Sequence, residues 1–234
     1  DGNSVVTIND ATMTLNGNGG NDFVGHGAGI TAAGTSHVTV NRAKIHSVGS
    51  IRVTVVGREE ATLEVNDSEL FVKDGTKPNH VSGMTKVPWM LGLTGRVRAT
   101  NLVDSATATY NRCHIKCENW GCMSTAATFT GCTVNSGKVG VMCHGGNGQG
   151  TLTVDKGTVF HTDRAVLQVK GRGVTMNISD AQLNSKIGVI LEAFPNDDPN
   201  MGPMPAGGPD GPGGPGGMPA MPDMGPAHDE VEVH

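Results

Sequence analysis

A ten-residue motif that recurs along the chain constrains the fold more than any other feature of the sequence. Residues 36–45 (SHVTVNRAKI) align with residues 61–70 (ATLEVNDSEL); further copies begin at residues 107, 128, 151 and 175, and a looser one covers residues 5–13. Such self-similarity predicts one structural unit per repeat, each packing on the next. The aligned apolar positions form two columns predicted to face the core: Ile8, Val40, Val65, Tyr110, Phe129, Val154 and Ile178, and Met13, Ile45, Leu70, Ile115, Val134, Val159 and Leu183.

A second alternating segment follows each copy of the motif, for example Ile51, Val53 and Val55, and then Trp89, Leu91 and Leu93. Alternation with period two is typical of β-strands, so each repeat is predicted to hold two strands. The spacing of 19 to 25 residues between uninterrupted copies suits one coil of a right-handed parallel β-helix, in which coils stack about 4.8 Å apart. The predicted fold is an all-β solenoid of about seven coils.

Composition divides the chain into a body and a tail. Residues 1–194 hold the repeats, whereas residues 195–227 hold ten of the twelve Pro, nine Gly and five of the eleven Met. Such a Gly/Pro/Met-rich segment forms neither a helix nor an interior strand, so it is predicted to be a linker or a wrapping segment. Residues 228–234 are acidic and alternate, which predicts a strand-like terminus or the start of a further coil.

Charge and hydropathy exclude two classes of partner. All 17 Lys and Arg lie at or before Lys186, and they form no basic run, which argues against nucleic-acid binding. No stretch of about 18 apolar residues is present, so no membrane span is expected. The remainder of a longer β-helix chain, or a second subunit, stays open as a partner.

The five cysteines, Cys113, Cys117, Cys122, Cys132 and Cys143, lack the C-x-x-C spacing of common zinc sites. We expect buried thiols that act as small hydrophobic residues. Cys113 and Cys132 stack in the repeat, near enough for a disulfide, but the odd count leaves one thiol unpaired. That count favours a reducing or anaerobic environment.

Two insertions, residues 16–28 and 74–87, interrupt the repeat, and long loops on a rigid scaffold often carry binding function. The second contains His80, a candidate ligand-binding residue. In the first, residues 17–25 (GNGGNDFVG) resemble one copy of the calcium-binding nonapeptide of RTX toxins, which makes Asn21 and Asp22 weak candidate calcium ligands. A Gly/Asn turn without metal is the alternative, and no other cofactor is expected.

The outward positions of the first strand gather ionisable side chains. Lys44, Glu69 and His114 fall on three successive coils, with His46 and Lys116 one position further along. A base, a carboxylate and a cation on one face are what proton abstraction needs, so Lys44, Glu69, His114 and Lys116 are the candidate catalytic residues. A mixed-charge solvent face is the alternative. The aligned outward columns are Lys44, Glu69, His114, Thr133, Thr158 and Gln182, and His46, Phe71, Lys116, Asn135, Phe160 and Asn184.

The outward positions of the second strand form an apolar strip that is rich in glycine. Trp89 and Trp120 fall at inward positions of the same strand and are expected in the core. Apolar strips rarely face water, so we expect the tail, a second subunit or a small apolar ligand to cover it, with the tail favoured. Its methionines, with His46 and His80, are the candidate ligand-binding residues. The strip reads Arg52, Met90, Gly121, Gly140, Val166 and Gly188, and Thr54, Gly92, Met123, Met142, Gln168 and Ile190.

Residues 4–193 resemble the pectin-lyase-like right-handed β-helix superfamily. Residues 88–92 (PWMLG), 98–102 (RATNL) and 120–121 (WG) are similar to a group of uncharacterised β-helix proteins of anaerobic gut bacteria. The resemblance implies the fold and a longer parent chain, and it slightly favours a secreted or bacterial cell-surface location. Pectate lyases hold calcium with stacked carboxylates; in this chain the outward columns supply only Glu69, so that mechanism is not implied.

Two functions remain open. One is a non-catalytic, adhesin-like β-helix that presents a rigid face and two loops to carbohydrate or another surface ligand. The other is a lyase, epimerase or isomerase that uses the candidate acid/base residues. Because the fold hosts many activities, the fold alone does not decide between them.

Overall fold

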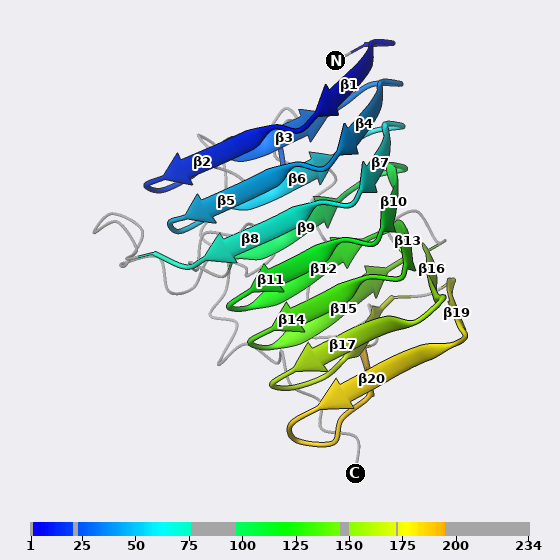
Figure 1. Ribbon diagram of the computed structural model, residues 1–234. Coiled ribbons are helices and arrows are strands. Elements are labelled where there is room, and N and C mark those ends of the chain that lie inside the picture. Colours follow the sequence, from blue (N-terminus) through cyan, green and yellow to red (C-terminus); the bar gives the residue numbers. More distant parts are fainter. Residues whose placement is uncertain (1, 21–22, 76–96, 146–149, 172, 195–234) are drawn as a thin grey trace, which may run out of the picture.

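The computed structural model describes residues 2–20, 23–75, 97–145, 150–171 and 173–194, and its regular elements there are all β-strands. Within these ranges, twenty-one strands form three parallel sheets of seven strands each, and the chain visits the sheets in turn. Successive coils therefore stack along one axis (Figure 1). This confirms the predicted solenoid of about seven coils, with the right-handed sense that parallel crossovers adopt. The described residues include no helix that would cross a membrane.

Each sheet takes one strand from every coil, in order from the first coil to the last. The first sheet contains β1 (Val5–Asn9), β4 (His37–Asn41), β7 (Thr62–Asn66), β10 (Thr107–Asn111), β13 (Ala126–Thr130), β16 (Gly150–Asp155) and β19 (Val174–Ile178). The second contains β2 (Thr12–Asn16), β5 (Lys44–Val48), β8 (Glu69–Lys73), β11 (His114–Cys117), β14 (Thr133–Ser136), β17 (Thr158–Thr162) and β20 (Ala181–Ser185). The third contains β3 (Ala28–Ala32), β6 (Val53–Gly57), β9 (Arg98–Leu102), β12 (Trp120–Ser124), β15 (Val139–His144), β18 (Leu167–Lys170) and β21 (Leu191–Phe194).

Each coil holds three strands, so the prediction of two was wrong. The motif that looked like one strand is two, separated by a residue in the left-handed backbone region, such as Arg42 with φ 53°. The preceding asparagines tie adjacent coils together: the Asn41 amide donates to Asn9 and the Asn66 amide donates to Asn41, each at 2.9 Å. The turn places two consecutive residues, Asn41 and Arg42, on the outward side, so the inward positions change from Val38 and Val40 to Ala43 and Ile45. Because every copy of the motif contains the turn at the same place, the aligned columns do not reveal it.

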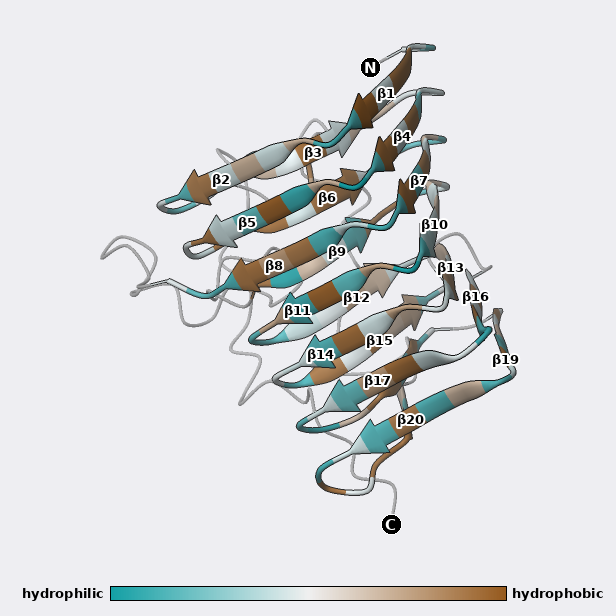
Figure 2. Cartoon of the chain, viewed as in Figure 1, coloured by the Kyte–Doolittle hydropathy of each residue, from teal (hydrophilic) through white to brown (hydrophobic). Residues whose placement is uncertain are grey.

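Stacked apolar side chains fill the interior, and hydrophilic residues alternate with them along strands such as β11 and β20 (Figure 2). The predicted column that includes Val65, Tyr110 and Phe129 is in register and fully buried in the middle coils. The Tyr110 and Phe129 rings stack with centroids 4.9 Å apart. Burial of each such side chain contributes roughly 1.5–3 kcal/mol, so the ladder stabilises the fold although aromatic residues are few.

The sixth coil is shifted by one residue relative to the predicted phase. Val134 pairs with Phe160, which is fully buried, whereas Thr133 pairs with Val159 on the outward face. The expected inward Val159 and outward Thr158 and Phe160 were therefore wrong. The cause is one extra residue in the turn, where Lys156 and Gly157 both have positive φ.

The third sheet also departs from the predicted pattern. Its strand in the third coil is β9, whereas the predicted Trp89, Leu91 and Leu93 lie outside the described residues. Gly121 and Gly140 face the core, because a Cβ on Gly140 would lie 2.7 Å from Cδ1 of Phe160. Trp120 is buried, as predicted, but it belongs to a second cluster on the outward side of the sheet and not to the main core.

Met123 and Met142 of the predicted apolar strip belong to that second cluster, whereas Gly121, Gly140 and Val166 of the strip face the main core, so the strip is not continuous as predicted. Met123 and Met142 are 2% and 1% exposed, and the partly buried Phe23 and Val189 pack against the cluster. The prediction that the C-terminal tail is the cover concerns residues 195–234, which lie outside the described residues.

The five cysteines are buried and none forms a disulfide, which confirms the prediction of buried thiols. The Cys113 backbone N–H donates to the Cys132 sulfur at 3.4 Å. Hydrogen bonding to Cys132, together with burial, raises the pKa of the Cys113 thiol. Burial raises the pKa of Cys117 and of Cys122 to about 12, so both stay protonated at neutral pH.

Candidate functional site

The outward side of the second sheet, which we call the polar face, carries the residues that the sequence singled out. Strand pairing aligns its side chains in two columns that run along the solenoid axis. The columns are Thr12, Lys44, Glu69, His114, Thr133, Val159 and Gln182, and Thr14, His46, Phe71, Lys116, Asn135, His161 and Asn184. Because the strands form one continuous ladder, the scaffold and not loop flexibility sets the spacing of these side chains.

Lys44, Glu69 and His114 occupy neighbouring strands, as predicted. The ionic contact of Glu69, however, is with His46: Oε1 of Glu69 lies 2.7 Å from Nε2 of His46. The His46 ring also meets Phe71 edge-on, with centroids 5.4 Å apart. On the other side of Phe71, Nζ of Lys116 lies 5.8 Å from the ring centroid.

A contact chain therefore spans the second, third and fourth coils. Its four residues are His46, Glu69, Phe71 and Lys116. The side chains of His46 and Glu69 are 42% and 46% exposed, so water screens their attraction and the pair contributes at most about 1 kcal/mol. Glu69 orients the imidazole and favours a proton on the nitrogen that faces it. Phe71 was not among the predicted site residues, although its place in an outward column pointed to it.

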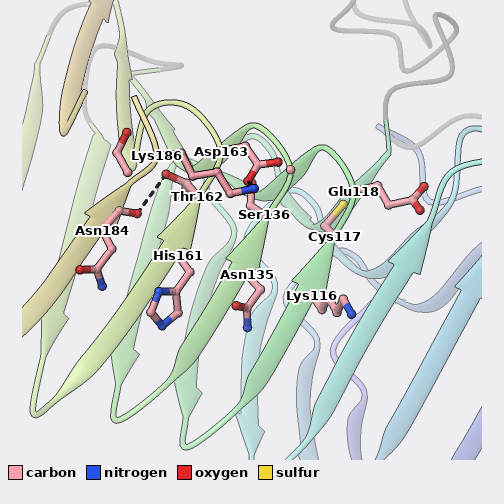
Figure 3. A pocket seen from close by; sticks show the side chains of 12 residues that line it. Lys116, Cys117, Glu118, Asn135, Ser136, His161, Thr162, Asp163, Asn184 and Lys186 are labelled. Atoms are coloured by element: carbon pink, nitrogen blue, oxygen red, sulfur yellow. Dashed lines mark hydrogen bonds and ion pairs between the residues drawn. The ribbon is translucent and has the colours of Figure 1, made fainter. Parts of the chain in front are cut away.

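Next to this chain of contacts, the polar face is hollowed into a groove of about 590 Å³. Lys116, Asn135, His161 and Asn184 stand in a row along it on four neighbouring strands, β11, β14, β17 and β20 (Figure 3). Glu118, Asp163 and Lys186 line its other side. Asp163 and Lys186 form an ion pair.

The sequence did not identify this groove. The predicted outward columns contain neither His161 nor Asp163, because the shifted phase of the sixth coil is not visible in the alignment. Once the extra residue at Lys156 and Gly157 is counted, His161 falls into the outward column between Asn135 and Asn184. The sequence contains one clue to the extra residue in that turn, which is Gly157, because glycine readily adopts a positive φ. The positive φ of the adjacent Lys156 cannot be recognised from the sequence.

The outward side of the third sheet is apolar and basic, and its predicted binding residues Met123 and Met142 are not accessible. Nearby, the Arg98 guanidinium lies over Trp120 at 5.3 Å from the ring centroid. Burial lowers the pKa of Arg98 to about 10, and burial followed by repulsion from Arg98 lowers the pKa of Lys170 to about 8. Keeping Arg98 and Lys170 charged on this face therefore lowers the stability of the folded protein.

The other predicted site residues, His80, Met90, Asn21 and Asp22, lie outside the described residues. Among the residues that are described, no three His, Cys, Asp or Glu side chains gather closely enough to hold a metal ion.

In comparisons with known proteins, no family model matches this chain, and neither does any curated protein or solved structure.

Proposed function

We propose that this protein is a non-catalytic, adhesin-like β-helix that binds carbohydrate or another surface ligand through the polar face. The observation that carries the proposal is the contact chain around Phe71: a partly exposed aromatic ring flanked by His46 and Lys116 on a rigid, open sheet. The proposal also includes membership of the pectin-lyase-like superfamily, which the sequence resembles, and the secreted or cell-surface location that this resemblance implies.

The chemistry of this arrangement suits a sugar. The C–H faces of sugar rings are apolar with slight positive charge, and they pack on aromatic faces, which carry partial negative charge. Hydroxyl groups around the ring then reach the polar neighbours, and such polar groups set the orientation and specificity of a bound ligand. Because the strand ladder already orders Phe71, His46 and Lys116, binding there loses little conformational entropy.

Affinity electrophoresis in gels that contain defined polysaccharides tests the proposal. We expect at least one polysaccharide to retard the protein, and Phe71→Ala to weaken binding roughly tenfold, about 1.4 kcal/mol. Thr62→Ala is the matched control, because Thr62 lies in the same coil on the first sheet. Circular dichroism of both variants checks that they fold. Retention by no polysaccharide, or equal weakening in both variants, would contradict the proposal.

A second candidate function rests on the hydrogen-bonded pair of His46 and Glu69. An imidazole oriented by a carboxylate acts as a general base, and Lys44 or Lys116 would neutralise negative charge that develops on a substrate, as in a lyase, epimerase or isomerase. His46 would then take the role expected of His114. Incubation with each retained polysaccharide, followed by mass spectrometry of the products, distinguishes the two: turnover that His46→Ala abolishes while retention persists favours the enzyme.

A further inference from the structure

The groove on the polar face contains hydrogen-bonding groups that have no partner among the described residues. Within the described part of the chain, the Asn135 amide and the His161 ring have no hydrogen-bond partner. The Asn184 amide donates to the Phe160 carbonyl oxygen at 3.0 Å, which leaves its own side-chain oxygen available. The row therefore offers both donors and acceptors, as a hydroxyl group requires, since hydroxyls donate and accept at once.

The charges that line the groove balance. Lys186 is paired with Asp163 inside it. At the opposite end, Lys116 faces Phe71, and Glu118 accepts the backbone N–H of Asp74 at 2.8 Å. Two cations and two anions leave no net positive field, whereas recognition of carboxylate or phosphate depends on an excess of Arg or Lys donors.

The row also runs along the solenoid axis, which is the direction that a bound linear oligomer would take. Asn135, His161 and Asn184 follow one another across coils five to seven, and Lys116 and Phe71 continue the same column across coils four and three. Neighbouring side chains are about 4.8 Å apart along the axis. A linear oligomer that lies along the axis therefore meets a new polar group at each coil. The groove volume is within the roughly 300–1,000 Å³ of sites that hold small ligands.

We propose that this groove binds an uncharged, hydroxyl-rich glycan, with Asn135, His161 and Asn184 as its hydrogen-bonding residues and Phe71, which lies next to Lys116 beyond one end of the groove, as the stacking platform. The inference rests on the proposed function and adds the substrate class: neutral sugars and not uronates.

The test compares neutral and acidic polysaccharides in the same gels. The probes are galactomannan, xyloglucan and mixed-linkage β-glucan as neutral polymers and polygalacturonate as the acidic one, each at low and high salt. We expect retention by a neutral polymer that high salt leaves unchanged, because screening weakens only interactions between charges. The double variant Asn135→Ala/His161→Ala should lose this retention at least tenfold. Thr128→Ala, in the same coil as Asn135 but on the first sheet, should retain it.

The outcomes separate this inference from the proposed function. Retention only by polygalacturonate, abolished by high salt, would overturn the neutral-glycan inference while carbohydrate binding stands. Neutral retention that the double variant does not weaken would also overturn it, because the ligand would then lie elsewhere. Retention by none of the four polymers would overturn the inference and leave the broader proposal to the wider panel. Thermal melting of the double variant, followed by circular dichroism, checks that it remains folded at the assay temperature.

Discussion

Replacing Phe160 with alanine tests the phase of the sixth coil, on which the position of His161 in the groove depends. Phe160 is fully buried, and its ring centroid lies 5.9 Å from that of Phe129 in an edge-to-face arrangement. Removal of a buried phenylalanine ring typically destabilises a protein by about 3–5 kcal/mol, because apolar contacts are lost and a cavity remains. The neighbouring backbone cannot collapse into that cavity easily, since strands on both sides hold it in the ladder. We therefore expect Phe160→Ala to lower the free energy of unfolding by roughly 4 kcal/mol.

Val159→Ala is the internal control for this experiment. Val159 is only half-buried, and its cross-strand neighbours on the outward face are Thr133 and Gln182. Loss of one such cross-strand contact changes stability by less than about 1 kcal/mol. Urea denaturation followed by circular dichroism gives both free energies by linear extrapolation. If Val159→Ala destabilises the protein as much as Phe160→Ala, the sixth coil has the phase predicted from sequence and His161 leaves the groove.

Two further predictions concern buried ionisable groups. The pKa of Lys170 falls from 10.5 to about 8 on folding, so the unfolded state binds more protons and stability rises with pH between those values, by roughly 3 kcal/mol in all. Lys170→Met should be more stable than the native chain at pH 7 and should lose that advantage near pH 10 in urea denaturation; an equal difference at both pH values would contradict the assignment. We also expect Ellman's reagent at pH 8 to modify none of the five thiols until urea is added, because all are buried. Rapid reaction of the folded protein would show that the interior is open.

Much of the fold could be predicted because two properties of the repeat, its alternation and its recurrence, specify it. Alternation of apolar and polar residues sets which side chains face inward, and recurrence sets which ones stack. The columns through Val65 and Leu70 illustrate this, since every pairing predicted there in coils two to five is present. The pairing of Lys44, Glu69 and His114 followed from the same columns without any knowledge of the structure.

The candidate site was harder to predict, because it depends on the phase of each coil. Alternation has a period of two, so a single extra residue in a turn exchanges the inward and outward faces of the strand that follows. The turn at Lys156 did this to β17 and hid His161. A related change of phase affects β12, where the consecutive residues Gly121 and Cys122 both face the core and Trp120 faces outward.

The sequence by itself determined that this chain is a parallel solenoid with a ladder of apolar residues inside and ionisable residues outside, because those properties depend only on periodicity. Only the tertiary structure decided that each coil has three strands, that Met123 and Met142 are covered, and that Asn135, His161 and Asn184 line one groove. These properties depend on backbone dihedral angles at a few turn residues and on packing between coils. Neither the dihedral angles nor the packing follows from the local residue pattern alone. The same alternating pattern can present either of its two faces to the core, and the length of the preceding turn decides which one does.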